Sequence, residues 1–338
     1  MSQQNKPGNS LAVNQAEQQV QSPKHSGIYR PQLFLLIACV YGFANTIPVF
    51  LFNLGFSPLL LVAIRTALGA ITLLIIFRSA LFHMSKTDWV YGLICGVFNT
   101  VNLLLLTYAI RLAGPANTTL IYSSGVVLVP FINWLIRKKK PRIVNIVAAL
   151  LCACGLVLAL IHCDIGLTFG LGEGLALIAA VWYTIFYIVL DKGAKKTKAE
   201  NINFIQLCTS VVLCLPAFFI FEFSSMPFVA EIWNYVWVLL VIGIVNDGVA
   251  FLLQTKGQAR VDPNLSSIYI YTTCLFGVTF SIIFGFEGFR WQLVAGALIV
   301  FLSIILPNIV DWIKAAKAKK ATKCKRALIK QGNRKSKK

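Results

Sequence analysis

The stretch SPLLLVAIRTALGAITLLIIF, residues 57–77, carries a single charged side chain, Arg65. A helix of about 20 apolar residues is long enough to cross the roughly 30 Å hydrocarbon core of a bilayer. Nine further runs along the chain have the same character. The ten predicted spans are 32–53, 57–77, 89–110, 116–136, 142–161, 169–190, 203–222, 233–254, 264–285 and 291–310.

The composition excludes a water-soluble protein. Hydrophobic residues make up 57% of the 338 residues and charged residues only 13%, whereas soluble domains have about 45–50% and 25%. The formal net charge of +19 lies at the edges of the apolar runs, and no stretch between the runs is long enough for a soluble domain. The sequence therefore predicts an all-α, polytopic membrane protein with ten transmembrane helices.

The positions of Lys and Arg predict the orientation, because cytoplasmic loops carry an excess of these residues. If both termini are cytoplasmic, 28 of the 31 Lys and Arg residues fall on the cytoplasmic side. We expect a disordered cytoplasmic N-tail (1–31) and a basic cytoplasmic C-tail (311–338) that binds anionic lipids. The C-tail has no interleaved aromatic residues for stacking on bases, so nucleic acid is not an expected partner.

The sequence gives no sign of catalytic or cofactor chemistry. The three histidines lie in predicted tails or loops, and the chain has no HExxH, GxSxG or Walker A motif. The nine cysteines form no CxxC pair, and we interpret those inside the spans as small packing residues. We therefore expect neither an enzyme nor a bound cofactor or metal.

The two halves of the chain contain an internal sequence repeat. Residues 96–120, GVFNTVNLLLLTYAIRLAGPANTTL, resemble residues 243–268, GIVNDGVAFLLQTKGQARVDPNLSSI. The matching pairs are Gly96 with Gly243, Asn99 with Asn246, and Pro115 with Pro263.

The period of about 147 residues contains five predicted helices, an odd number, so the second copy must cross the membrane in the opposite sense. We expect a first five-helix repeat over 32–161 and a second over 162–310. Two inverted halves support rocking between outward-open and inward-open states, which favours a carrier over a receptor or scaffold.

Two charged residues lie well inside predicted spans, Arg65 and Asp247. A charge at the bilayer centre costs roughly 2.5–3.5 kcal/mol on insertion scales, so each needs a partner or a wet cavity. They either pair with each other and lock two helices together, or face a central cavity. There Arg65 would bind a carboxylate, and Asp247 a cation or a proton. Asp247 replaces Thr100 of the first copy.

Further polar and aromatic residues occur at related depths in the predicted helices. Any one of them can be explained by hydrogen bonding between helices, but together they predict a solvated path with aromatic walls. The candidate substrate-binding residues are Arg65, Asp247, Asn99, Asn102, Asn246, Tyr122, Tyr183, Tyr187 and Tyr271.

Three segments resemble the EamA-type proteins of the drug/metabolite transporter superfamily: FSPLLLVAIR (56–65), TYAIRLAGP (107–115) and QLVAGALI (292–299). The resemblance covers nearly the whole chain between residues 32 and 310. It departs at RKKK (137–140), where the family commonly has a Gly-Glu pair. It implies ten helices in two inverted halves, movement of small organic metabolites and a bacterial inner membrane.

Our functional hypothesis is a secondary transporter that works by alternating access, as an exchanger or a proton-coupled carrier. One cationic and one anionic residue in the membrane favour a zwitterionic or cationic metabolite. An amino acid would fit, and the resemblance adds S-adenosylmethionine or S-adenosylhomocysteine. The alternatives are an exporter of drugs or other metabolites, and a channel or non-transporting receptor. Transport direction, coupling ion and oligomeric state stay open.

Overall fold

The computed structural model describes residues 31–81, 84–125, 127–128, 131, 134, 142–162, 166–167, 169–225, 230–258, 270 and 272–335. The predicted N-tail therefore lies outside the described residues, apart from Pro31.

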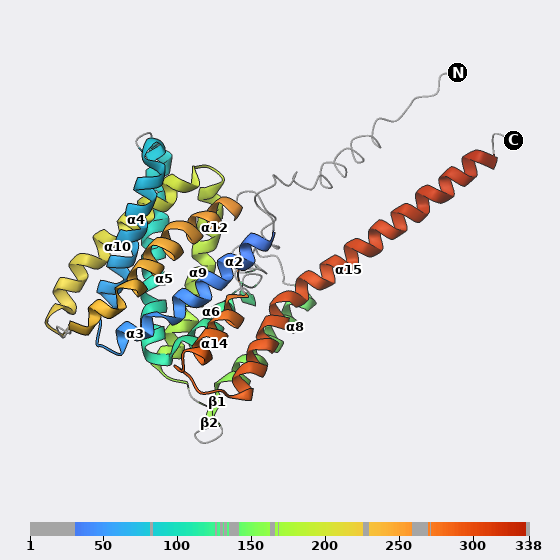
Figure 1. The fold of residues 1–338 in the computed structure, drawn as a ribbon. Helices are drawn as coiled ribbons and strands as arrows, with labels where there is room; N and C mark the ends of the chain where they lie inside the picture. Colours follow the sequence, from blue (N-terminus) through green and yellow to red (C-terminus); the bar gives the residue numbers. More distant parts are fainter. Residues whose placement is uncertain are drawn as a thin grey trace.

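The first half of the chain forms α2 (Pro31–Thr46), α3 (Pro48–Phe52), α4 (Pro58–Leu81), α5 (Lys86–Ala113), α6 (Pro115–Ser123) and α8 (Ile143–Leu160). A short hairpin follows, with strands β1 (Ile161–His162) and β2 (Gly166–Leu167). The second half forms α9 (Leu171–Ala194), α10 (Ala199–Phe221), η1 (Phe223–Ser225), η2 (Ala230–Tyr235), α11 (Val236–Leu240), η3 (Val241–Ala250), α12 (Phe251–Gln258), α14 (Thr273–Ile283) and α15 (Trp291–Lys335). Figure 1 shows them as one helical bundle.

Eight helices of the described chain are long and apolar enough to cross a membrane. They correspond to eight of the ten predicted runs. The other two runs contain α6 and the shorter apolar helix Thr273–Ile283, and parts of both runs lie outside the described residues. Prolines stand at the first position of several helices, where the missing N–H has no intrahelical partner to lose.

The bundle has two distinct ends. In Figure 1, α2 begins and α15 leaves the bundle at the same end, which we call the terminus end. The opposite end, which we call the far end, carries the turn between α3 and α4 and the residues that follow α10. Exposed tryptophans mark both ends, as in the aromatic belts of membrane proteins: Trp89 and Trp312 at the terminus end, Trp233 and Trp291 at the far end. The helix of α15 continues through the basic tail to Lys335.

Helix packing follows the inverted repeat. The contacts of α4 with α10, of α6 with α14 and of α8 with α15 each join a helix to its counterpart in the other half. The contact of α5 with α10 is matched by that of η3 with α4, and the contact of α6 with α9 by that of α14 with α2. For these pairs, exchanging the halves returns the same neighbours.

The two glycines matched in the repeat have the same packing role. A Cβ atom on Gly243 would lie 2.9 Å from the backbone oxygen of Arg65, and one on Gly96 would lie 3.0 Å from Cα of Gln206. Arg65 and Gln206 are each the eighth residue of their helices, which begin at Pro58 and Ala199. Each glycine thus allows a close crossing at the same point of the counterpart helix.

Candidate functional site

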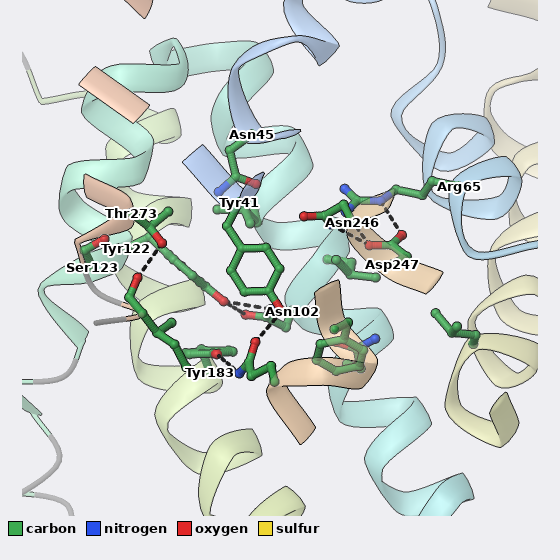
Figure 2. A pocket seen from close by; sticks show the side chains of 17 residues that line it. Tyr41, Asn45, Arg65, Asn102, Tyr122, Ser123, Tyr183, Asn246, Asp247 and Thr273 are labelled. Atoms are coloured by element: carbon green, nitrogen blue, oxygen red, sulfur yellow. Dashed lines mark hydrogen bonds and ion pairs between the residues drawn. The ribbon is translucent and has the colours of Figure 1, made fainter. Parts of the chain in front are cut away.

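A cavity lies between the two halves, near the middle of the spans that form it. Its empty space is roughly 730 Å³ when the solvent-open part is included. Figure 2 shows its polar and aromatic side chains converging from both halves. The lining residues are Tyr41, Asn45, Arg65, Asn99, Asn102, Leu103, Leu106, Tyr122, Ser123, Tyr183, Leu207, Asn246, Asp247, Phe251, Gln254, Ile270 and Thr273.

Arg65 and Asp247 form a buried, two-pronged ion pair on one wall of the cavity (Figure 2). Nε of Arg65 donates to Oδ2 of Asp247 at 2.7 Å, and Nη2 donates to Oδ1 at 2.8 Å. Their side chains are 5% and 8% exposed. Such planar, bidentate pairs are the strong class of charged hydrogen bond. The sequence left open whether the two residues pair or face the cavity, and the structure shows both.

Asp247 lies on an unusual helical segment. Val241–Ala250 is a π-helix, whereas the matching part of the first half lies inside the regular α-helix α5. Wide helical turns of this kind are rare and occur frequently at functional sites. The two halves therefore differ in backbone form at the segment that carries the acidic residue.

Asn246 adds a third donor to the carboxylate. Its Nδ2 donates to Oδ1 of Asp247 at 2.8 Å. Its Oδ1 is buried and has no hydrogen-bond partner among the described residues. A buried polar atom without a partner costs about 1–3 kcal/mol, so this amide oxygen is available to a donor on a bound molecule.

The opposite wall of the cavity is aromatic. The rings of Tyr122 and Tyr183 lie 5.1 Å apart between centroids. Asn102 donates from Nδ2 to the Tyr122 hydroxyl at 3.0 Å. Gln254 donates to the Tyr183 hydroxyl at 3.2 Å, and its Oε1 accepts a hydrogen bond from Tyr41. These bonds orient the hydroxyls at the cavity surface.

Two carboxylates join helices at the far end. Glu222 accepts hydrogen bonds from the hydroxyls of Ser57 and Tyr108 and from the backbone N–H of Leu59, and so connects α10 with α4 and α5. One carboxylate with three donors therefore holds these three helices together at the far end.

Glu287, in the loop before α15, accepts from the backbone N–H of Ala116 at 3.0 Å. It therefore caps the N-terminus of α6 from the other half of the chain. Burial raises the pKa of Glu287, while the Ala116 N–H and the charge of Arg290 act in the opposite direction.

Most of the predicted binding residues line the cavity. They are Arg65, Asp247, Asn99, Asn102, Asn246, Tyr122 and Tyr183. Tyr187 is not among the lining residues; its ring lies 6.1 Å from that of Tyr183 and packs behind the wall. Tyr271 lies outside the described residues. Whether any of these residues binds a substrate stays a prediction.

Tyr41 and Gln254 were not among the predicted binding residues, although both line the cavity and Tyr41 donates to Gln254. Tyr41 is a polar residue in an otherwise apolar part of α2, which is a usable signal, whereas Gln254 begins the polar sequence QTKGQ at the end of α12. A row of buried polar residues on α10, at spacings of three and four, was not predicted either: Asn203, Gln206 and Ser210.

The fold and the cavity define a polytopic membrane protein whose two inverted halves enclose a polar cavity about midway along the spanning helices. The sequence matches the EamA-like transporter family over residues 31–161 and 170–309. The chain therefore belongs to this family, whose members are membrane transporters of small solutes.

A solved crystal structure has the same fold, with a TM-score of 0.61 and 19% sequence identity. The match covers 82% of this chain and 96% of the other. At this identity the likeness bears on the fold alone. No curated protein sequence matches the chain.

Proposed function

We propose that this protein is a secondary transporter that moves a zwitterionic metabolite by alternating access, as an exchanger or a proton-coupled carrier. The observation that carries the proposal is the Arg65–Asp247 pair in the wall of a mid-membrane cavity. Membership of a transporter family and the inverted halves support the transport step.

The pair favours a zwitterion because its two charges neutralise each other. A solute with one charge would satisfy one member of the pair and leave the other buried and unpaired, which costs several kcal/mol. A zwitterion can present a carboxylate to Arg65 and a cationic group to Asp247 at the same time. Each charged side chain then exchanges its partner in the protein for the opposite charge on the solute.

The aromatic wall suits the remainder of such a solute. The faces of Tyr122 and Tyr183 attract a cation or stack on a planar group, and the amide of Asn246 offers an unpaired oxygen. Amino acids meet these requirements, as do S-adenosylmethionine and S-adenosylhomocysteine, which the family resemblance adds. Both termini are proposed to be cytoplasmic in a bacterial inner membrane, with the basic C-tail at anionic lipids.

The test is uptake of radiolabelled zwitterions into proteoliposomes, with and without preloaded unlabelled solute, followed by competition. Asp247→Asn and Arg65→Gln should each lower saturable uptake at least tenfold. Asp191→Asn serves as the control, because it removes a carboxylate from the exposed pair with Lys195. Full uptake in both cavity variants would overturn the proposal. Flux that neither saturates nor shows counterflow would indicate a channel instead.

A further inference from the structure

Helix α10 carries a row of polar side chains that the cavity does not explain. Asn203, Gln206 and Ser210 are each 0% exposed and lie on one side of the helix at spacings of three and four residues. Only Leu207 of this helix lines the cavity. We call Asn203, Gln206, Ser210 and the neighbouring Thr255 of α12 the polar stripe.

Interhelical hydrogen bonding accounts for part of the polar stripe. Ser210 and Thr100 share a hydrogen bond of 2.8 Å that joins α10 to α5. Thr255 donates to Oδ1 of Asn203 at 3.1 Å and joins α12 to α10. Contacts of this kind are the usual reason for polar residues inside a helical membrane protein.

Gln206 does not fit that explanation. Its side-chain hydrogen bond, from Nε2 to Oδ1 of Asn203 at 3.3 Å, stays within one helix and joins no second helix. Oε1 of Gln206 and Nδ2 of Asn203 are buried and have no hydrogen-bond partner among the described residues. One unpaired acceptor and one unpaired donor therefore lie three residues apart, in a region where each such group is costly.

Asn203 and Thr255 of the polar stripe lie on the terminus side of the cavity residues Leu207 and Gln254. Gln206 lies at the level of Leu207, and Ser210 lies one turn toward the far end. Asn203 is near the start of α10 at Ala199, whereas Leu207 reaches the cavity one turn further along. On α12, Thr255 directly follows the cavity residue Gln254. Beyond the stripe, Lys256 and Glu200 form a partly exposed ion pair at 3.3 Å.

We infer that Asn203, Gln206 and Thr255 of the polar stripe form the first part of the path by which water and solute pass between the cavity and the terminus end. This rests on the proposed transport function. Water molecules, and neutral hydrogen-bonding groups of the solute, would bind in turn to Oε1 of Gln206 and Nδ2 of Asn203. Opening at this end requires the Lys256–Glu200 pair to separate, which exposes two groups that water solvates well.

The experiment measures water access at the stripe in the full-length protein. In a cysteine-free parent that still transports, Asn203→Cys is treated with a charged, membrane-impermeant methanethiosulfonate from each side in turn. Ile202→Cys is the matched control, because Ile202 is the preceding residue, is equally buried, and packs among apolar side chains. Thr255→Cys, with Leu252→Cys as its control, repeats the test on α12.

Asn203→Cys and Thr255→Cys should react at least tenfold faster than their controls when the reagent is added at the terminus end. Equal rates, or faster reaction from the far end, would overturn the inference. If a variant on one helix does not fold, the cysteine variant and control on the other helix test the inference in the same way. Uptake by the unmodified protein separates the two claims: no zwitterion uptake by that protein contradicts the proposed function, whereas inert stripe cysteines in an active cysteine-free parent contradict only the path.

Discussion

Gln206 occupies in α10 the place that Arg65 occupies in α4. Each is the eighth residue of its helix, and each lies under the glycine of the repeat, Gly96 or Gly243. The two crossings therefore have the same backbone framework but different chemistry. The crossing at Arg65 contains an ion pair, and the crossing at Gln206 contains a neutral amide.

This relationship predicts the behaviour of a variant in which the crossing at Arg65 carries the residues of the crossing at Gln206. Arg65→Gln combined with Asp247→Thr reproduces the Gln206 and Thr100 arrangement. We expect the double variant to fold with a melting temperature within a few degrees of the parent, because no unpaired charge is left. Its uptake should nevertheless fall at least tenfold, because the charges that bind the solute are gone.

The single variants provide the comparison. Removing one member of a buried pair leaves the other charge unpaired, a loss of roughly 3–5 kcal/mol. Arg65→Gln alone should therefore unfold at a lower temperature than the double variant, as measured by intrinsic fluorescence in detergent. If the double variant transports normally, the pair is structural and the solute binds elsewhere.

The close helix crossing predicts a second set of stability effects. In Gly243→Ala the new Cβ would lie 2.5 Å from Cβ of Leu68, so helices η3 and α4 must separate. Overpacking of this kind costs about 1–3 kcal/mol. Thermal unfolding in detergent should show a lower melting temperature. Gly174→Ala is the control, because a Cβ at that position meets nothing within 4 Å. A neutral result for Gly243→Ala would mean that the crossing is looser than the structure shows.

Much of the architecture could be predicted from the sequence because it depends on length and hydropathy alone. A run such as 57–77 has few alternatives to a membrane-spanning helix, since unpaired backbone groups are not tolerated in lipid. Arg65 and Asp247 could also be identified from the sequence as candidate site residues, because a charged residue inside a membrane span is costly and is usually functional. Their pairing with each other was one of two alternatives, since hydropathy does not say which helices touch.

The site was less predictable where local geometry decides it. Tyr183 and Tyr187 are one helical turn apart, and spacing alone placed both at the cavity, yet the cavity ends at Tyr183. The π-helix of η3, which orients Asp247, has no signature in the sequence. The start of α10 was predicted at residue 203 instead of Ala199, so Asn203 was placed at a membrane edge and its burial was overlooked.

Glu222 at the far end predicts coupling between three helices. Its carboxylate accepts from the hydroxyls of Ser57 and Tyr108. Hydrogen bonds to a charged group are worth about 1.5–3 kcal/mol each. Tyr108→Phe should therefore destabilise the parent but have much less effect in a Glu222→Ala background. Tyr235→Phe, whose ring stacks on Phe50, is the control. Additive effects of the two substitutions on the melting temperature would contradict the shared bond.

The last prediction concerns pH and the stability of the far end. Burial raises the pKa of Glu287 in the folded protein above its ordinary value of 4.5, which the unfolded chain retains. The folded state therefore holds this proton more tightly than the unfolded state does. The stability that the bound proton contributes is fully present below pH 4.5 and is lost as the pH rises through the folded pKa.

The groups that face Glu287 act in both directions. The Ala116 N–H and Arg290 favour the ionised form, whereas burial and the carboxylate of Glu173 oppose it. Glu287→Gln keeps an acceptor for Ala116 but cannot ionise. We expect the melting temperature of the parent to fall relative to this variant as the pH rises from 4 toward neutrality, with Asp191→Asn following the parent throughout. A parent that gains stability relative to Glu287→Gln over that range would show that Arg290 and the helix N-terminus outweigh burial.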